Sequence, residues 1–192
     1  MTDQGSEGLF SSFLRKKPIT AVKQYLCGDI LDFGCGSGNL ARFVSPDHYL
    51  GIDQDESSLQ IARRTHPEHV FYDEIAKVDR TFDTITILAV IEHVADPVFL
   101  LKQLCTFLRA SKESRIVCTT PTPALRSIHE LGAKCGLFSL HASDEHEELL
   151  GQNRLAEVGQ AASMCLTLYQ RFLFGANQIA IFEASKSYSS QA

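Results

Sequence analysis

Short apolar runs alternate with amphipathic segments along most of this chain. The apolar runs predict strands at 29–33, 49–52, 69–72, 84–88 and 115–120, and residues at helical spacing predict helices at 39–43, 57–64 and 97–108. Strands that are apolar almost throughout and are separated by helices are typical of a parallel sheet covered on both faces. The pattern therefore predicts an α/β fold with a doubly wound sheet.

The pattern changes after the strand that ends near Pro121. Beyond a long segment, 122–147, we expect a helix at 148–159 and two β-rich runs at 163–172 and 178–184. The tripeptide Gly175-Ala176-Asn177 joins these two runs. A short turn of this composition favours an antiparallel hairpin.

The first residues form a separate unit in this interpretation. Apolar positions from Leu9 to Leu26 fall near helical spacing and are interrupted by Pro18, which predicts two short helices or one broken helix. With 192 residues and 44% apolar content, the rest of the chain can bury one substantial core. We expect a helical segment at 1–26, a single domain at 27–186 and a flexible tail at 187–192.

Charge and composition narrow the class of protein. The formal net charge of −5 argues against an extended nucleic-acid surface, because such surfaces need clustered Lys and Arg. A polar start and the lack of a long apolar run predict a cytoplasmic protein without a signal peptide or membrane span. The six cysteines are scattered, with no C-x-x-C pair, so neither a zinc site nor a compact disulfide framework is predicted.

The strongest chemical signal is a glycine-rich loop after the first predicted strand. Residues 30–39 read Ile-Leu-Asp-Phe-Gly-Cys-Gly-Ser-Gly-Asn, and Asp53 ends the next apolar run. Alternating glycines let the backbone approach a ligand closely, and a carboxylate at the end of the neighbouring strand can accept hydrogen bonds from both ribose hydroxyls. One register, Gly36, Gly38 and Ala41, satisfies the dinucleotide fingerprint. The sequence therefore predicts a nucleoside-containing cofactor, with two cofactor families open at this point.

A second motif separates these two families. The segment 82–94 reads Phe-Asp-Thr-Ile-Thr-Ile-Leu-Ala-Val-Ile-Glu-His-Val. Together with Asp32 two residues before the first glycine, it resembles class I S-adenosylmethionine-dependent methyltransferases. The predicted helix 97–108 and strand 115–120 match the next unit of that family. The resemblance implies a Rossmann-like, seven-stranded, mainly parallel sheet with an antiparallel last strand, and S-adenosylmethionine as cofactor.

The resemblance also implies roles for individual residues. The glycine loop would lie beside the methionine end and ribose, with Asp32 shaping it, while Asp53 would bind the ribose hydroxyls. An acid after the third strand would contact adenine, for which Asp73 is the best match and Glu74 the second. The implied cofactor-binding residues are Asp32, Gly34, Cys35, Gly36, Gly38, Asp53, Gln54, Asp73, Leu88 and Ala89.

Glu92 and His93 are candidate catalytic residues at the end of the fourth strand. A neutral His can take a proton from a hydroxyl substrate, and a neighbouring carboxylate would raise its basicity. The alternative is that both side chains fix the loop by bonding to the backbone. Relatives with a metal have a second carboxylate three positions before this Glu-His, where Ala89 stands here, so no metal is expected.

A second polar cluster includes His141 and His146, which are candidates for the substrate side of the cleft. Asp144-Glu145-His146 and the run 172–178 resemble a sub-group associated with glycan and sugar-nucleotide pathways. We expect a methyltransferase acting on a small hydroxylated, sugar-like acceptor. The alternatives are a non-catalytic cofactor-binding partner or regulatory protein and a dinucleotide-dependent oxidoreductase.

Overall fold

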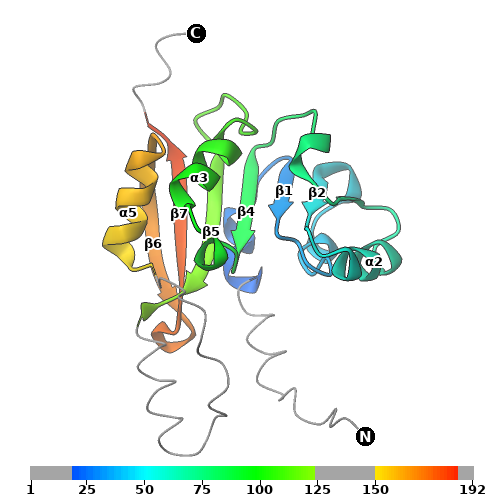
Figure 1. The fold of residues 1–192 in the computed structure, drawn as a ribbon, viewed down its shortest axis with the longest axis horizontal. Helices are drawn as coiled ribbons and strands as arrows, with labels where there is room; N and C mark the ends of the chain where they lie inside the picture. The colour runs from blue at the N-terminus through cyan, green and yellow to red at the C-terminus, as the bar shows by residue number, and fades with distance from the viewer. Residues whose placement is uncertain (1–18, 124–149, 186–192) are drawn as a thin grey trace, which may run out of the picture.

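The computed structural model describes residues 19–123 and 150–185, which form a seven-stranded sheet between two layers of helices (Figure 1). The strand order is β3-β2-β1-β4-β5-β7-β6. The strands β1 to β5 are parallel, and β7 is antiparallel to both β5 and β6. The strands are β1 (Ile30–Phe33), β2 (Tyr49–Ile52), β3 (Val70–Tyr72), β4 (Thr84–Leu88), β5 (Arg115–Pro121), β6 (Met164–Phe172) and β7 (Asn177–Ala184).

Three longer α-helices complete the layers, and the first two have clear cap signals: α2 (Glu56–Thr65), α3 (Pro97–Cys105) and α5 (Gln152–Ala161). Asp55 caps α2 by accepting hydrogen bonds from the amides of Ser57 and Ser58, and Asp96 caps α3 by accepting one from Phe99. Such caps satisfy amide groups that the first helical turn leaves open. Short 3-10 turns cover Lys23–Tyr25, Ala41–Phe43, Pro46–His48, Ile75–Lys77, Ile91–His93 and Leu173–Gly175.

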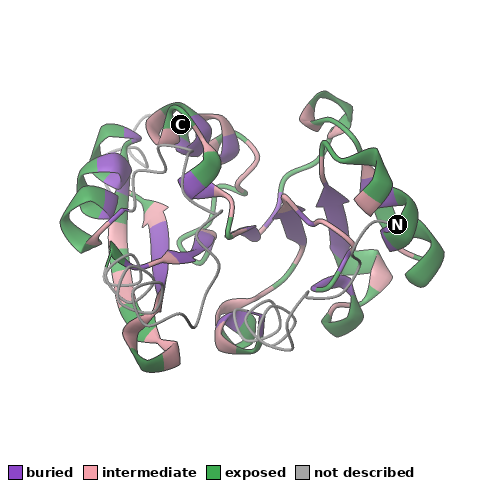
Figure 2. Ribbon diagram, turned by 60° about the horizontal axis from the view of Figure 1, so that its bottom comes forward, coloured by how far each residue is buried: buried purple, intermediate pink, exposed green. Residues whose placement is uncertain are grey.

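Alternating residues of each strand pack into different cores. Leu31 of β1 belongs to the core that α3 and α5 cover, whereas its neighbour Ile30 packs on the other face with Leu59 and Ala62 of α2. Both faces of the sheet are therefore buried, which explains why the strands are apolar almost throughout. Figure 2 shows the buried positions concentrated in the strands and the exposed ones on the outer sides of the helices.

Two predicted helices are shorter in the structure. The expected helix at 39–43 is only the 3-10 turn Ala41–Phe43, because the Ala41 amide closes a turn on the Gly38 carbonyl before it, and Val44 and Ser45 are extended ahead of Pro46 after it. The helix expected at 97–108 ends at Cys105. Beyond it, the carbonyl of Phe107 accepts a hydrogen bond from the Phe82 amide and the Arg109 amide donates to the Phe82 carbonyl, so the chain joins the start of β4 instead of continuing the helix.

The described end of the N-terminal segment lies against the sheet. Residues 19–22 are helical, and in Figure 1 residues 19–25, in blue, lie behind the sheet, with α3 and α5 in front. Val22 is fully buried with Val117, Ile179 and Ile181. Within the described ranges, no helix is long and apolar enough to cross a membrane.

The fold makes Phe182 a sensitive test of the α5 face. This residue of β7 is fully buried, and a Cβ added to Gly159 of α5 would lie 2.8 Å from its ring. We expect Phe182→Ala to lower the free energy of unfolding by about 3–5 kcal/mol, measured by denaturant titration. The matched variant Phe99→Ala, at an exposed position on α3, should change it by less than about 0.5 kcal/mol. Equal effects of the two variants would contradict the packing described here.

Candidate functional site

The residues expected to hold the cofactor lie at one edge of the sheet. In the strand register, Phe33 is level with Ile52 and Ile52 with Tyr72, so β1, β2 and β3 end side by side. The arrowheads of β1, β2 and β4 point to the lower edge of the sheet in Figure 1. The glycine loop, Asp53, Asp73 and Ala89 each follow one of these strand ends. Ligands of open α/β sheets bind at this carboxyl edge.

The glycine loop is tied to the end of β2 by its backbone amides. The amides of Gly34 and Cys35 both donate to the carbonyl of Ile52, at 2.8 and 2.9 Å. The Gly36 amide donates to Oδ2 of Asp53 at 2.7 Å, and Oδ1 of Asp53 accepts from the Asp55 amide at 2.9 Å. These amides therefore form hydrogen bonds within the protein, while the glycines leave room for a ligand to approach the loop backbone.

The carboxylate of Asp53 is held in place by these bonds. Two amides fix its half-buried carboxylate, and each oxygen keeps acceptor capacity for another donor. Its rival role as a cap of the following helix is filled by Asp55. The next residue, Gln54, is exposed. This arrangement suits a carboxylate that accepts hydrogen bonds from a diol.

Gly34 and Gly36 of the loop lack a side chain for different physical reasons. Gly34 has a φ of +76°, and a Cβ there would lie 2.3 Å from Cγ2 of Val90, so a side chain is excluded by the segment after β4. Gly36 has a φ of +52°, but a Cβ there meets nothing within 4 Å. The space beside Gly36 is thus open in the protein, which fits a site that a bound group occupies.

Asp32 lies beneath the loop in a buried polar network. Its Oδ2 accepts a hydrogen bond from the Tyr49 hydroxyl at 2.8 Å, and its Oδ1 accepts one from the Thr86 hydroxyl at 2.7 Å. Burial raises the pKa of Asp32 to about 6, against the lowering effect of these two hydroxyl groups. Asp32 therefore supports the loop from inside the sheet.

The remaining cofactor candidates differ in their surroundings. Asp73 is exposed and forms an ion pair with Lys77, whose hydrogen bond holds the pKa of Asp73 below its ordinary value. Cys35 is buried, and burial raises the pKa of its thiol, so it contributes to the loop as a small packed side chain. Leu88 is half-buried, and Ala89 is exposed with a φ of +55°. The left-handed backbone at Ala89 turns the chain directly after β4.

The two residues of the Glu92-His93 motif lie in different environments. Glu92 is buried on the 3-10 turn Ile91–His93, close enough to Cys118 to raise the pKa of that thiol further beyond the effect of burial, whereas His93 is exposed. His93 is therefore the more accessible candidate base. Among the residues that the structure describes, no group of three or more His, Cys, Asp or Glu is arranged to hold a metal ion. His141 and His146 lie outside the described residues.

Sequence reasoning missed Tyr49 and Thr86 as partners of Asp32. In register, Asp32 lies between Gly51 of β2 and Thr86 of β4. Tyr49, two residues before Gly51 and on the same face of β2, reaches Asp32 with its hydroxyl. The available signal was a pair of threonines, Thr84 and Thr86, within an otherwise apolar strand.

Comparison with known proteins identifies the family of this fold. Residues 10–163 match the family model described as a methyltransferase domain. The chain is similar in structure to an S-adenosylmethionine-dependent methyltransferase from Clostridium acetobutylicum, with a TM-score of 0.67, 12% identity and coverage of 92% and 95% of the two chains. It is also similar to magnesium protoporphyrin IX methyltransferase from Synechocystis with bound SAH, with a TM-score of 0.67, 15% identity and coverage of 95% and 90%.

Curated relatives share part of their length with this chain. A ubiquinone biosynthesis O-methyltransferase from Aeromonas salmonicida is 23% identical over 147 residues, which are 70% of this chain and 62% of the relative. One from Alkalilimnicola ehrlichii is 37% identical over 79 residues, which are 35% of this chain and 32% of the relative. The chain thus spans about three fifths of the first relative and about a third of the second.

The raised pKa of Asp32 predicts a pH-dependent stability. Its folded value of about 6 exceeds the ordinary value of 3.8, so its protonation stabilises the fold below about pH 4, and this contribution is lost as the pH rises through about 6. We expect the unfolding free energy of the wild type to fall by about 2 kcal/mol between about pH 4 and pH 7, relative to Asp32→Asn. Denaturant titrations across this range measure it, with surface Asp79→Asn as the baseline. A constant difference between wild type and Asp32→Asn would contradict it.

Proposed function

This chain belongs to the methyltransferase domain family, and on that premise we propose that it is an S-adenosylmethionine-dependent methyltransferase acting on an oxygen of a small hydroxylated molecule. The observation that carries the proposal is the Asp53 carboxylate, fixed by two amides beside the open space at Gly36. The oxygen acceptor is supported by the curated relatives, which are O-methyltransferases. A sugar-like acceptor stays a prediction.

The residues at the carboxyl edge divide the binding task in this proposal. Asp53 accepts hydrogen bonds from the ribose hydroxyls, with Gln54 next to it. Asp73 reaches the adenine, which requires it to share its carboxylate with Lys77. The loop of Gly34, Gly36 and Gly38 lies along the methionine end, while Leu88 and Ala89 form the floor beneath the sulfur.

For methyl transfer, the protein has to position the two reactants and provide a proton acceptor. Bound S-adenosylmethionine supplies an electrophilic methyl group on a sulfonium, so the protein's work is to orient and desolvate the reactants. His93, exposed at the end of β4, accepts the proton of the acceptor hydroxyl in this scheme. Buried Glu92 lies on the same 3-10 turn as His93.

Cofactor binding is tested at Gly36. We expect wild type to bind S-adenosylhomocysteine in calorimetry and not NAD, and Gly36→Val to weaken this binding at least about a hundredfold, because the side chain fills the open space. The control is Gly175→Val, since Gly175 also has a positive φ and free space around a Cβ but lies in the β6–β7 turn. Unchanged affinity in Gly36→Val would refute the loop assignment, and binding of NAD alone would favour an oxidoreductase.

Catalysis is tested by transfer of a labelled methyl group from S-adenosylmethionine to a panel of hydroxylated acceptors. We expect His93→Gln to lower kcat about a hundredfold while leaving S-adenosylhomocysteine affinity unchanged, because the proton acceptor is lost and the cofactor contacts are not. Unfolding free energy, measured in parallel, should stay near that of the wild type because His93 is exposed. Cofactor binding without transfer to any acceptor would instead support a non-catalytic binding protein.

A further inference from the structure

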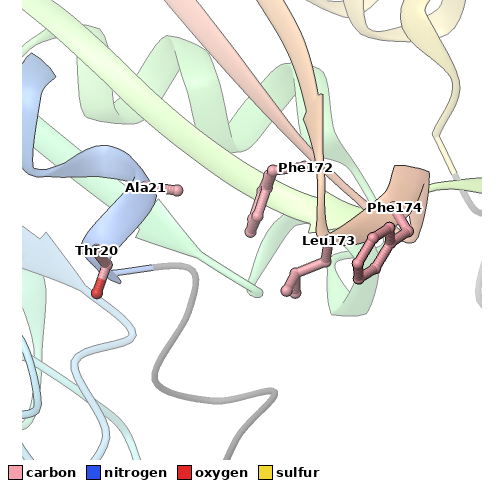
Figure 3. A pocket seen from close by; sticks show the side chains of 5 residues that line it. All are labelled: Thr20, Ala21, Phe172, Leu173 and Phe174. Atoms are coloured by element: carbon pink, nitrogen blue, oxygen red, sulfur yellow. The ribbon is translucent and has the colours of Figure 1, made fainter.

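An apolar pocket lies at the same edge of the sheet as the proposed active site. It has a volume of about 440 Å³ and is lined by Thr20, Ala21, Phe172, Leu173 and Phe174. Figure 3 shows Ala21 pointing from the N-terminal helical residues toward Phe172, with Leu173 and Phe174 projecting from the turn between β6 and β7. Only Thr20 among these side chains carries a polar atom. The pocket is shallow and open to solvent, so it can contact one side of an apolar group.

The turn that forms one wall has an unusual backbone. Leu173, Phe174 and Gly175 have φ values of +51°, +54° and +86°. Two hydrogen bonds from Thr122, directly after β5, anchor this turn: its amide donates to the Ala176 carbonyl and its hydroxyl to the Gly175 carbonyl. The anchored turn leaves the Phe174 ring fully exposed. Non-glycine residues held in this conformation cluster at ligand-binding sites.

The pocket and the proposed floor of the cofactor site border the same buried cluster. Leu88, at the end of β4, packs against the same buried cluster as Ala21 and Phe172, around Val22 and Val117. The turn also lies at the matching edge, because Asn177 of β7 pairs with Pro121, two residues beyond the partner of Leu88. Among the described strands, only β5 and β7 lie between β4 and β6.

The distance along the sheet decides which part of an acceptor the pocket can take. Neighbouring strands lie about 4.8 Å apart and three such steps separate β4 from β6, while Phe172 is level with Pro121, two residues beyond the partner of Leu88. Phe172 therefore lies about 16 Å from Leu88. A group in the pocket is therefore remote from the oxygen that receives the methyl group. Carbon-lined walls also leave sugar hydroxyls without hydrogen-bond partners, which disfavours a polar occupant.

From this geometry we infer that the acceptor is amphiphilic: a hydroxylated head reacts beside Leu88, and an apolar extension occupies the pocket against Phe172 and Phe174. The inference rests on the proposed function and adds the substrate class to it. Phe174 is a specificity-determining residue in this arrangement. Its exposed ring gains an apolar partner only when the extension is bound.

Two matched probe pairs test this inference without knowledge of the natural head group. The pairs are methyl and hexyl β-D-glucoside, and resorcinol and 4-hexylresorcinol, each titrated into the protein saturated with S-adenosylhomocysteine. We expect the hexyl member of each pair to bind wild type at least about tenfold more tightly. Phe174→Ser should reduce that ratio about fivefold, and Phe174→Leu should restore most of it because it keeps an apolar side chain.

Control variants separate the inference from the proposed function. Phe99→Ser removes an exposed ring elsewhere, on α3, and should leave the ratio unchanged. All three variants should bind S-adenosylhomocysteine as wild type does. If wild type fails to bind S-adenosylhomocysteine, the proposed function falls and the inference with it. If it binds but the hexyl group adds nothing, or adds as much in Phe174→Ser, the inference alone is overturned. Phe174-dependent binding to phosphatidylcholine vesicles without a hexyl preference overturns it in favour of a lipid surface.

Discussion

The site depends on how the glycine loop is fastened to the neighbouring strand. The Ile52 carbonyl accepts two loop amides and the Asp53 carboxylate accepts a third, so the loop and the acid that would hold the ribose form one hydrogen-bonded unit. In a parallel sheet both lie at the same edge, and the buried backbone groups are satisfied without a ligand. The proposed cofactor site is therefore preorganised by main-chain bonds, with its open space beside Gly36.

Beneath that unit, a buried polar network connects three strands. Asp32 of β1 accepts hydrogen bonds from Tyr49 of β2 and Thr86 of β4, so the strands that carry the glycine loop, Asp53 and the Glu92-His93 turn meet at one residue. A carboxyl group in such a place is costly when ionised, and its raised pKa is the consequence of burial. Through this network, the protonation state of the Asp32 carboxyl is linked to the position of the glycine loop.

The two halves of the sheet serve different parts of the proposed reaction. The half formed by β1, β2 and β3 carries the glycine loop and the polar side chains proposed to bind the cofactor. The half formed by β5, β7 and β6 carries aromatic and aliphatic side chains around the turn Leu173–Gly175. Since β4 lies between them, Leu88 contacts the apolar clusters of both halves. A reaction centred at the end of β4 would thus have a polar donor side and an apolar acceptor side.

The sequence by itself determined the features that depend on local pattern. Apolar runs predicted all seven strands to within one residue at each end, and the antiparallel hairpin at 163–184 is confirmed. The glycine loop and Asp53 were identifiable because spacing along a strand, loop and strand is local. The start of the expected helix at 39–43 and the end of the helix expected at 97–108 were not, since the turn at Gly38 decided the first and the pairing of Phe82 with the segment after α3 decided the second.

Only the tertiary structure decided which side chains meet across the sheet. The partners of Asp32, the burial of Glu92 beside exposed His93, and the pocket between Ala21 and Phe172 all join residues far apart in the chain. Such contacts depend on strand order and register, which a periodic pattern does not contain. The local sequence pattern therefore specified the helices, the strands and the glycine loop. Long-range packing specified the raised pKa of Asp32 and the apolar pocket beside Phe172.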